Sequence, residues 1–362
     1  MRVINSIWLR QQIRWFLPLV LAIAVKLISL NEVLVERFYS TFFFHYVTMP
    51  LRFVMCKVPF SVGDCLYVLI ALVFVYQGIV FAKRAWRLVF TLHFYRKWLA
   101  SIIPNFLWLY IVFNVLWGLN YNRLGVAAQM HIVNQPYTAE QLTKVNCYFL
   151  EQMNAQRVLV GDSMVTYPST DSLFKWCIQA YDTCASRLPF LRSHRLNIKS
   201  SLLTKVVSYA GYSGYYNPFT TEAQVNTDLP PFLLPFVCTH ELAHQIGYAS
   251  ESEANFIAYL VCSSSSNPYF RYSAFFEMYL TANSQLYQVD YCAARVNTRS
   301  YHQWVKKDIQ TYKDFIYGKQ NRVEPMAKWV YDSYLKANQQ TKGIESYDDV
   351  IAWIINYHEQ YP

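Results

Sequence analysis

Apolar segments in the first 120 residues restrict the possible folds of this chain more than any other feature. Residues 65–82 (CLYVLIALVFVYQGIVFA) and 98–120 (WLASIIPNFLWLYIVFNVLWGLN) carry no charged side chain over about the length that spans a bilayer core. Residues 15–30 are also apolar except for Lys26, whose long side chain can reach the membrane surface. We therefore expect membrane-spanning helices at about 15–30, 65–82 and 98–120.

The composition supports a membrane protein. Of all residues, 54% are hydrophobic and only 15% are charged, whereas about a quarter of the residues of a soluble domain are charged. A cleaved signal peptide is the alternative interpretation of residues 15–30, but no small-x-small cleavage site follows them. We therefore favour a retained membrane anchor.

The distribution of basic residues predicts how the chain crosses the membrane. The segment before the first apolar run has basic residues and no acid, namely Arg2, Arg10 and Arg14. The segment between the second and third runs has the same character, with Lys83, Arg84, Arg87, Arg96 and Lys97. By the positive-inside rule both segments are cytoplasmic, so residues 121–362 lie outside the cytoplasm. The net charge of +9 thus indicates a membrane lipid surface as partner and no nucleic acid.

Two domains follow from this pattern. Residues 1–120 form the membrane domain, and its aromatic stretch at 41–54 (TFFFHYVTMPLRFV) is expected in the headgroup region. Residues 121–362 have the composition of a globular domain, with helical apolar spacing at 134–156, 171–187 and 303–317. Residues 221–226 alternate as one short strand. The expected fold is therefore mainly α, with a small sheet.

The sequence HELAH at 240–244 is the strongest chemical signal in the globular domain. Pro235 suits the first turn of a helix and Gly247 suits its end. His240 and His244 are then one helical turn apart on one face, which is the spacing that two imidazoles need to share an ion. Glu241 lies about 100 degrees round the helix. It can therefore act as a general base beside Zn²⁺ without being a ligand.

A catalytic zinc site has three protein ligands, and the next segment offers two candidates for the third. Residues 250–260 (SESEANFIAYL) begin a second helix with Ser250 as its N-cap. The Ser-x-x-Glu spacing predicts a capping box in which Glu253 has the structural role. Glu251 is then the ligand, and Glu253 remains the alternative. The eight scattered cysteines contain no CxxC pair, which excludes a cysteine-rich zinc module.

These two helices resemble those of gluzincin metallopeptidases, the thermolysin-like and prenyl-protease-like enzymes. In that group the ligand glutamate is followed three and four residues later by a small residue and by Asp or Asn, and here the matching residues are Glu251, Ala254 and Asn255. The resemblance implies a gluzincin-like α+β metallopeptidase domain in which Asn255 holds a ligand histidine. An asparagine that faces solvent is the alternative. The short spacing from His244 to Glu251 departs from most gluzincins and requires a sharp turn at Gly247.

The same resemblance suggests where a substrate binds. Zinc peptidases that resemble this one pair an extended substrate with an edge strand beside the site. The candidate residues here are Ala223, Gln224, Val225 and Asn226. A hairpin that only covers the core is the alternative.

Over almost its whole length the chain also resembles a family of bacterial inner-membrane proteins of unknown function with three N-terminal spans. The shared segments here are WGLNYNR (117–123), GYYNPFTTEAQVN (214–226), HELAHQIG (240–247), EANFIAYL (253–260) and YDSYLKAN (331–338). The resemblance implies a location in the bacterial inner membrane and supports the metal site, but it implies no substrate. One departure is Thr221, where a glycine is expected.

The resulting hypothesis is a zinc metallopeptidase that cleaves peptides or proteins on the outer face of the cytoplasmic membrane. His240, His244 and Glu251 would hold Zn²⁺, and Glu241 would take the proton from the attacking water. One alternative is a zinc-containing membrane sensor that binds a peptide or envelope ligand without turnover. Another is a structural or transport protein with an incidental HExxH, which would hold no stoichiometric zinc.

Overall fold

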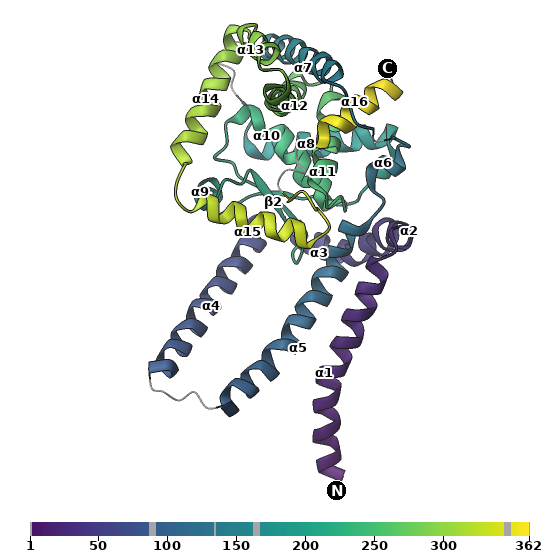
Figure 1. Cartoon of the computed structure of the whole chain (residues 1–362), viewed down its shortest axis with the longest axis vertical. Helices are drawn as coiled ribbons and strands as arrows, with labels where there is room; N and C mark the ends of the chain where they lie inside the picture. The colour runs from purple at the N-terminus through teal and green to yellow at the C-terminus, as the bar shows by residue number, and fades with distance from the viewer. Residues whose placement is uncertain (1, 87–91, 134, 162–166, 344–348, 362) are drawn as a thin grey trace.

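The computed structural model describes residues 2–86, 92–133, 135–161, 167–343 and 349–361. In this part of the chain the protein is mainly helical with one three-stranded sheet, which confirms the expected mainly α class. Three long helices extend from one side of a globular body that contains the sheet (Figure 1).

The long helices contain most of the three predicted apolar segments, although the third helix ends at Leu116 and residues 118–120 belong to a separate short helix. The long helices are α1 (Arg2–Ser29), α4 (Val62–Trp86) and α5 (Leu92–Leu116). Between α1 and α4 the chain turns through short helices at the base of the globular body, namely α2 (Glu32–Leu34), the π-helix η1 (Val35–Phe43) and α3 (Phe44–Met55). α1 packs against α5.

By length and apolarity, one of these helices could cross a membrane. Within the described residues, Val62–Lys83 of α4 is long and apolar enough to cross a membrane, with a mean hydropathy of 2.4. Arg14–Ser29 and Glu32–Met55 meet the same criterion only as a pair bent by 96°, and Ile102–Leu116 is a shorter apolar helix. Residues 87–91 of the basic segment that predicts the orientation lie outside the described residues.

The globular body begins after α5. Its first elements are η2 (Gly118–Asn122), α6 (Gly125–Gln129), α7 (Ala139–Val160), α8 (Thr170–Arg187), η3 (Pro189–Leu191), β1 (Ile198–Ser200), α9 (Thr204–Tyr209), β2 (Gly214–Asn217) and β3 (Glu222–Val225). Its later elements are η4 (Pro231–Leu233), α10 (Leu234–Gln245), α11 (Glu251–Ser263), α12 (Pro268–Val289), α13 (Tyr291–Arg299), α14 (Gln303–Lys319), α15 (Glu324–Ala337) and α16 (Val350–Gln360).

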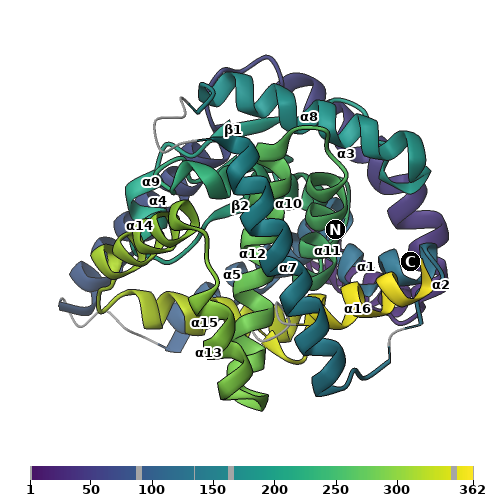
Figure 2. The same ribbon diagram turned by 90° about the horizontal axis from the view of Figure 1, so that it is seen from above.

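The core of the body forms around α10, α11 and α12, which lie at its centre in the view from above (Figure 2). α7 packs along α12, and α8 contacts both α10 and α11. α7 begins at Ala139 rather than at the predicted residue 134. Thr138 and Gln141 form a capping box there, so the first free N–H groups of the helix are bonded.

The sheet corrects one prediction about the substrate strand. Its order is β1-β3-β2, with β1 parallel and β2 antiparallel to β3. The predicted edge strand Ala223–Gln224–Val225 therefore lies in β3 at the centre, and the backbone N–H of Asn226 donates to Ser213 O at 3.0 Å. Assigning these residues to an edge strand is wrong, because β1 covers their other side. β1 has three residues, too few to show an alternating pattern, so this strand was not predicted.

Candidate metal centre

The HExxH helix is α10, and it ends as the sequence predicts. Pro235 lies in its first turn. The chain then reverses at Gly247, whose φ of +101° is rarely adopted by other residues. A β-carbon on Gly247 would lie 3.1 Å from the ring of Phe44 in α3. The short connection therefore brings α11 back against α10, and the two helices pack together.

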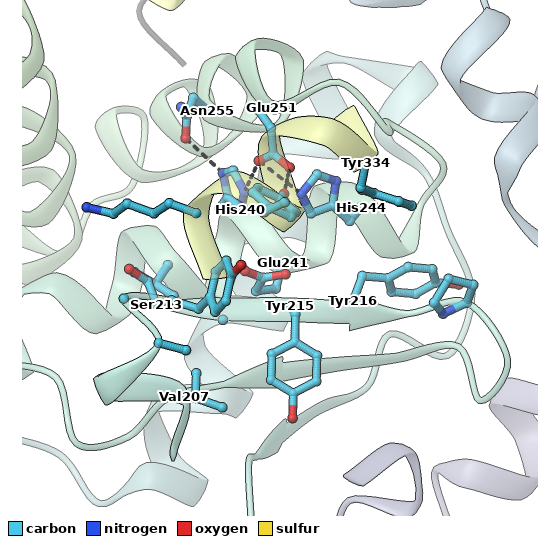
Figure 3. Close-up of a pocket in the computed structure, with 18 of the residues that line it drawn as sticks. Val207, Ser213, Tyr215, Tyr216, His240, Glu241, His244, Glu251, Asn255 and Tyr334 are labelled. Carbon is cyan, nitrogen blue, oxygen red and sulfur yellow. Dashed lines mark hydrogen bonds and ion pairs between the residues drawn. The ribbon is translucent and has the colours of Figure 1, made fainter. Parts of the chain in front are cut away.

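Three potential ligands converge between α10 and α11. The Oε2 atom of Glu251 lies 3.2 Å from His240 Nε2 and 3.5 Å from His244 Nε2. Within the described residues these three side chains form a group whose ligand atoms all lie within 4.8 Å of one another. Figure 3 shows the three side chains meeting, and two imidazoles with one carboxylate are a common catalytic zinc set.

The outer nitrogen of each imidazole is held by a hydrogen-bond acceptor. His240 Nδ1 donates to Asn255 Oδ1 at 2.8 Å, and His244 Nδ1 donates to the carbonyl of Tyr248 at 2.7 Å. Each bond leaves the Nε2 lone pair directed toward Glu251, as metal-binding histidines require. Asn255 thus contacts the histidine and does not face solvent. The hydroxyl of Tyr331 in α15 donates to the other oxygen of Glu251.

The electrostatics of the site favour a cation. Burial would lower the pKa of His244, but the carboxylate of Glu251 outweighs that effect and raises it to about 9. Burial would raise the pKa of Glu251, yet the two imidazoles hold it well below its usual range. A proton on His244 therefore supplies positive charge beside this buried carboxylate. A divalent cation would supply the same charge.

Glu241 is buried between this group and β2 (Figure 3). Burial raises its pKa to about 7, although His240 and His244 oppose this effect. Its Oε2 atom has no hydrogen-bond donor within the described part of the chain. A buried carboxylate oxygen without a donor fits a site built to contact a water molecule.

Glu253, the alternative ligand, is directed elsewhere. Its Oε1 atom accepts the N–H of Val126 at 2.8 Å in the first turn of α6. Ser250 is the N-cap residue of α11, but its side chain makes no capping hydrogen bond. The predicted capping box is therefore wrong, because the carboxylate of Glu253 accepts the Val126 N–H of α6 instead. Glu251, and not Glu253, lies with the histidines.

The side chains that hold the end of α10 were not predicted from the sequence. The Arg123 guanidinium donates to Gly247 O at 2.9 Å, and that of Arg52 donates to Gln245 O. Both positive charges thus lie at the carboxyl end of the helix, where they are favourable. The ring of Trp117 is 6.0 Å from that of His244, edge to face. Trp117 and Arg123 fall in the segment WGLNYNR, but no pattern in that segment indicates these contacts.

A cavity of about 960 Å³ opens onto the site. His240, Glu241, His244 and Glu251 line it, as do β2 and the ends of α4 and α5 that adjoin the globular body (Figure 1). This volume is at the upper end of the range for small-molecule sites.

Residues 39–355 match the model of a protein family described as "Protein of unknown function (DUF3810)". Comparison with curated proteins and with solved structures gives no match.

Proposed function

Because this chain belongs to the DUF3810 family, whose function is unknown, we propose an activity from the site itself. The protein is a zinc-dependent metallopeptidase, anchored in a membrane, that hydrolyses peptide bonds outside the cytoplasm. One observation carries the proposal. The ligand atoms of His240, His244 and Glu251 converge, and beside them Glu241 keeps a buried carboxylate oxygen without a donor.

Each residue of the site has a distinct role in this proposal. Zn²⁺ bound by His240, His244 and Glu251 would supply Lewis acidity, which polarises a carbonyl and makes water more acidic. Glu241 accepts a proton from the attacking water at its free Oε2 and returns it to the leaving amine. Asn255 and the Tyr248 carbonyl keep both imidazoles in the tautomer that can bind the ion.

The sheet supports a role for β2 in binding an extended peptide. β2 is an edge strand, contacts α10, and contributes Gly214, Tyr215 and Tyr216 to the cavity. A peptide can add to such an edge by main-chain hydrogen bonds. β2 therefore takes the place of the residues first predicted from sequence.

The membrane anchor is proposed from the apolar helices. α4 supports one crossing by itself. α1 and α5, which extend from the same side of the body, are proposed as further spans (Figure 1). α3 and η1 expose aromatic and other apolar side chains at the base of the body, including Phe42, Tyr46, Met49 and Phe53. Such side chains suit the headgroup layer. The basic segments at 2–14 and 83–97 support cytoplasmic placement of the opposite ends of these helices.

The full-length chain, purified in detergent, tests the proposal through bound metal and peptide cleavage together. We expect about one zinc per chain in the wild type and in Glu241→Gln, and cleavage of a fluorogenic peptide library by the wild type alone. Glu251→Gln should lose zinc. Glu253→Gln should keep it, because an amide oxygen can still accept the Val126 N–H.

Two results would contradict the peptidase. A wild-type protein without stoichiometric zinc would favour the incidental motif. Zinc with no cleavage, together with identical envelope-protein fragments in cells carrying wild type and Glu241→Gln, would favour the sensor.

A further inference from the structure

The cavity over the metal centre extends from the globular body onto the membrane-proximal helices. Tyr67 and Ile70 of α4 line it on one side, and Leu109 and Phe113 of α5 line it on another, together with Trp117 just after that helix. Leu109 is 51% exposed and Ile70 is 38% exposed. Part of the cavity wall is therefore continuous with the apolar outer surface of the proposed spans.

The position of these residues along α4 places them at the membrane surface. Tyr67 and Ile70 lie about 8 and 12 Å along the helix from its first residue, at 1.5 Å per residue. The headgroup layer on each side of a bilayer is roughly 5 to 8 Å thick. If α4 crosses the membrane with its first turn at the outer surface, Tyr67 lies near the hydrocarbon boundary and Ile70 just inside it.

Hydrogen bonds attach the first turn of α4 to the three-stranded sheet beside the metal centre. Glu222 of β3 accepts the N–H groups of Val62 and Gly63, at 3.2 and 2.6 Å, and is paired with Lys199 of β1 at 2.5 Å. Asp64 accepts the N–H of Leu202 at 2.6 Å and the hydroxyl of Tyr215 in β2. These bonds hold the α4 wall of the cavity in a defined position relative to β2.

Aromatic side chains connect α5 to the ligand carboxylate. The ring of Phe113 is 6.3 Å from that of Tyr334 in α15, and Tyr334 stacks on Tyr331 at 6.1 Å. Tyr331 donates to Glu251. Trp117, which directly follows α5, contacts His244. The wall from the membrane level to the metal ligands is therefore apolar and aromatic, with few groups that would bind a polar chain.

From this geometry we infer the class of substrate, given the peptidase activity proposed above. The substrate is a polypeptide anchored in the same membrane, and its segment just outside the bilayer reaches the metal centre along the wall formed by α4 and α5. Its apolar residues cover the exposed side chains of Ile70 and Leu109, and burial of such surface stabilises the complex. Hydrolysis then breaks one C–N bond, as water adds oxygen to the carbonyl carbon and a proton goes to the amine.

Reconstituted vesicles test this inference with two forms of one peptide library. The same randomised segment is presented free in solution or joined to a polyleucine membrane helix, with the zinc-loaded full-length protein in phospholipid vesicles. Ile70→Trp and Leu109→Trp each place a bulky indole ring in the space along this wall. Each should lower the ratio of kcat/KM for the anchored form to that for the free form by about tenfold. The controls Leu72→Trp and Val112→Trp lie exposed on the same two helices outside the cavity lining and should leave the ratio unchanged.

A crosslinking measurement makes the test independent of cleavage. The polyleucine helix carries a photo-leucine near its outer end and is mixed with Glu241→Gln protein in the same vesicles. We expect crosslinks to Ile70, Leu109 or Phe113, mapped by mass spectrometry. Crosslinks confined to Leu72 and Val112, or no crosslinks, would overturn the inference.

The outcomes separate this inference from the peptidase itself. An anchored-to-free ratio that Ile70→Trp and Leu109→Trp leave unchanged would overturn the membrane route, while cleavage of the free library would still support the peptidase. Crosslinks at Ile70 or Leu109 without cleavage of either library would support the route and contradict the peptidase.

Discussion

Gly214 of β2 lies directly against the carboxyl group of Glu241. A β-carbon on Gly214 would be 2.6 Å from Glu241 Oε1 and 2.8 Å from the main-chain oxygen of Gln224. The second atom belongs to the central strand and cannot move alone. The absence of a side chain at this position therefore allows the sheet edge to approach the proposed general base.

Gly214→Ala should reduce activity without removing the metal. The added methyl group must displace the Glu241 carboxyl, and a shift of about 1 Å at a catalytic group can cost roughly 100-fold in rate. We expect kcat/KM to fall at least about tenfold while zinc content stays at the wild-type level. Gly318→Ala is the control, since nothing lies within 4 Å of the added carbon. Full activity in Gly214→Ala would show that Glu241 tolerates displacement.

Asn255→Ala should weaken metal binding. Loss of the Oδ1 acceptor frees the His240 ring and its tautomer, and such changes typically cost 10- to 100-fold in metal affinity, as an order of magnitude. Competition with a chelator measures the effect. Asn255→Asp should retain affinity because a carboxylate also accepts from Nδ1. Ser252→Ala on the same helix is the control, and an equal loss in that variant would assign the effect to the stability of α11.

Thr221→Gly should stabilise the protein. Thr221 has a φ of +57°, its side chain is fully buried, and its hydroxyl has no hydrogen-bond partner within the described residues. A β-branched residue in the left-handed region costs about 1 to 2 kcal/mol. We expect the free energy of unfolding to rise by about 1 kcal/mol, measured by denaturant titration in detergent.

Two variants control this prediction. Thr221→Ala removes the hydroxyl but keeps the backbone cost, so it should gain less than Thr221→Gly. Thr220→Gly loses the hydrogen bond from Thr220 to Glu222 at 2.8 Å and should destabilise the protein. A larger gain from Thr221→Ala would assign the effect to the buried hydroxyl.

Glu277 should make stability depend on pH. This residue of α12 lines the cavity, and burial raises its pKa to about 7 from 4.5. Its carboxyl group has no ion pair or hydrogen bond among the described residues. The folded state therefore binds the proton of Glu277 more tightly than the unfolded state does. Protonated Glu277 makes its full contribution to the free energy of unfolding below pH 4.5, and this contribution is lost as the pH rises to about 7.

Glu277→Gln should match the wild type in stability at low pH and exceed it at about pH 8. Because the side chain is only half-buried, we expect a difference of roughly 1 to 2 kcal/mol. Thermal unfolding at about pH 5 and pH 8 measures it. The exposed Glu151→Gln on α7 should show no such dependence. An equal effect in both variants would rule out burial as the cause.

The local features of the site could be predicted because each follows from a short stretch of chain. The spacing of His240 and His244 places both imidazoles on one helical face in any fold that keeps the helix. Pro235 and Gly247 mark where that helix begins and ends for equally local reasons. The apolar segments predicted the long helices in the same way, since their length and lack of charge are properties of the segments themselves.

Contacts between distant segments decided which carboxylate joins the histidines, which strand is central in the sheet and what binds the end of α10. Glu253 satisfied a local capping rule, but in the folded chain its carboxylate accepts the N–H of Val126 in α6, more than a hundred residues earlier. β3 became a central strand because β1 pairs with its other side. Arg52 and Arg123 bind the end of α10 from segments that show no sign of this in their own sequence. Local periodicity determined which groups α10 can present, whereas long-range packing decided which of them meet, because buried polar atoms take whichever partner the folded chain brings within reach.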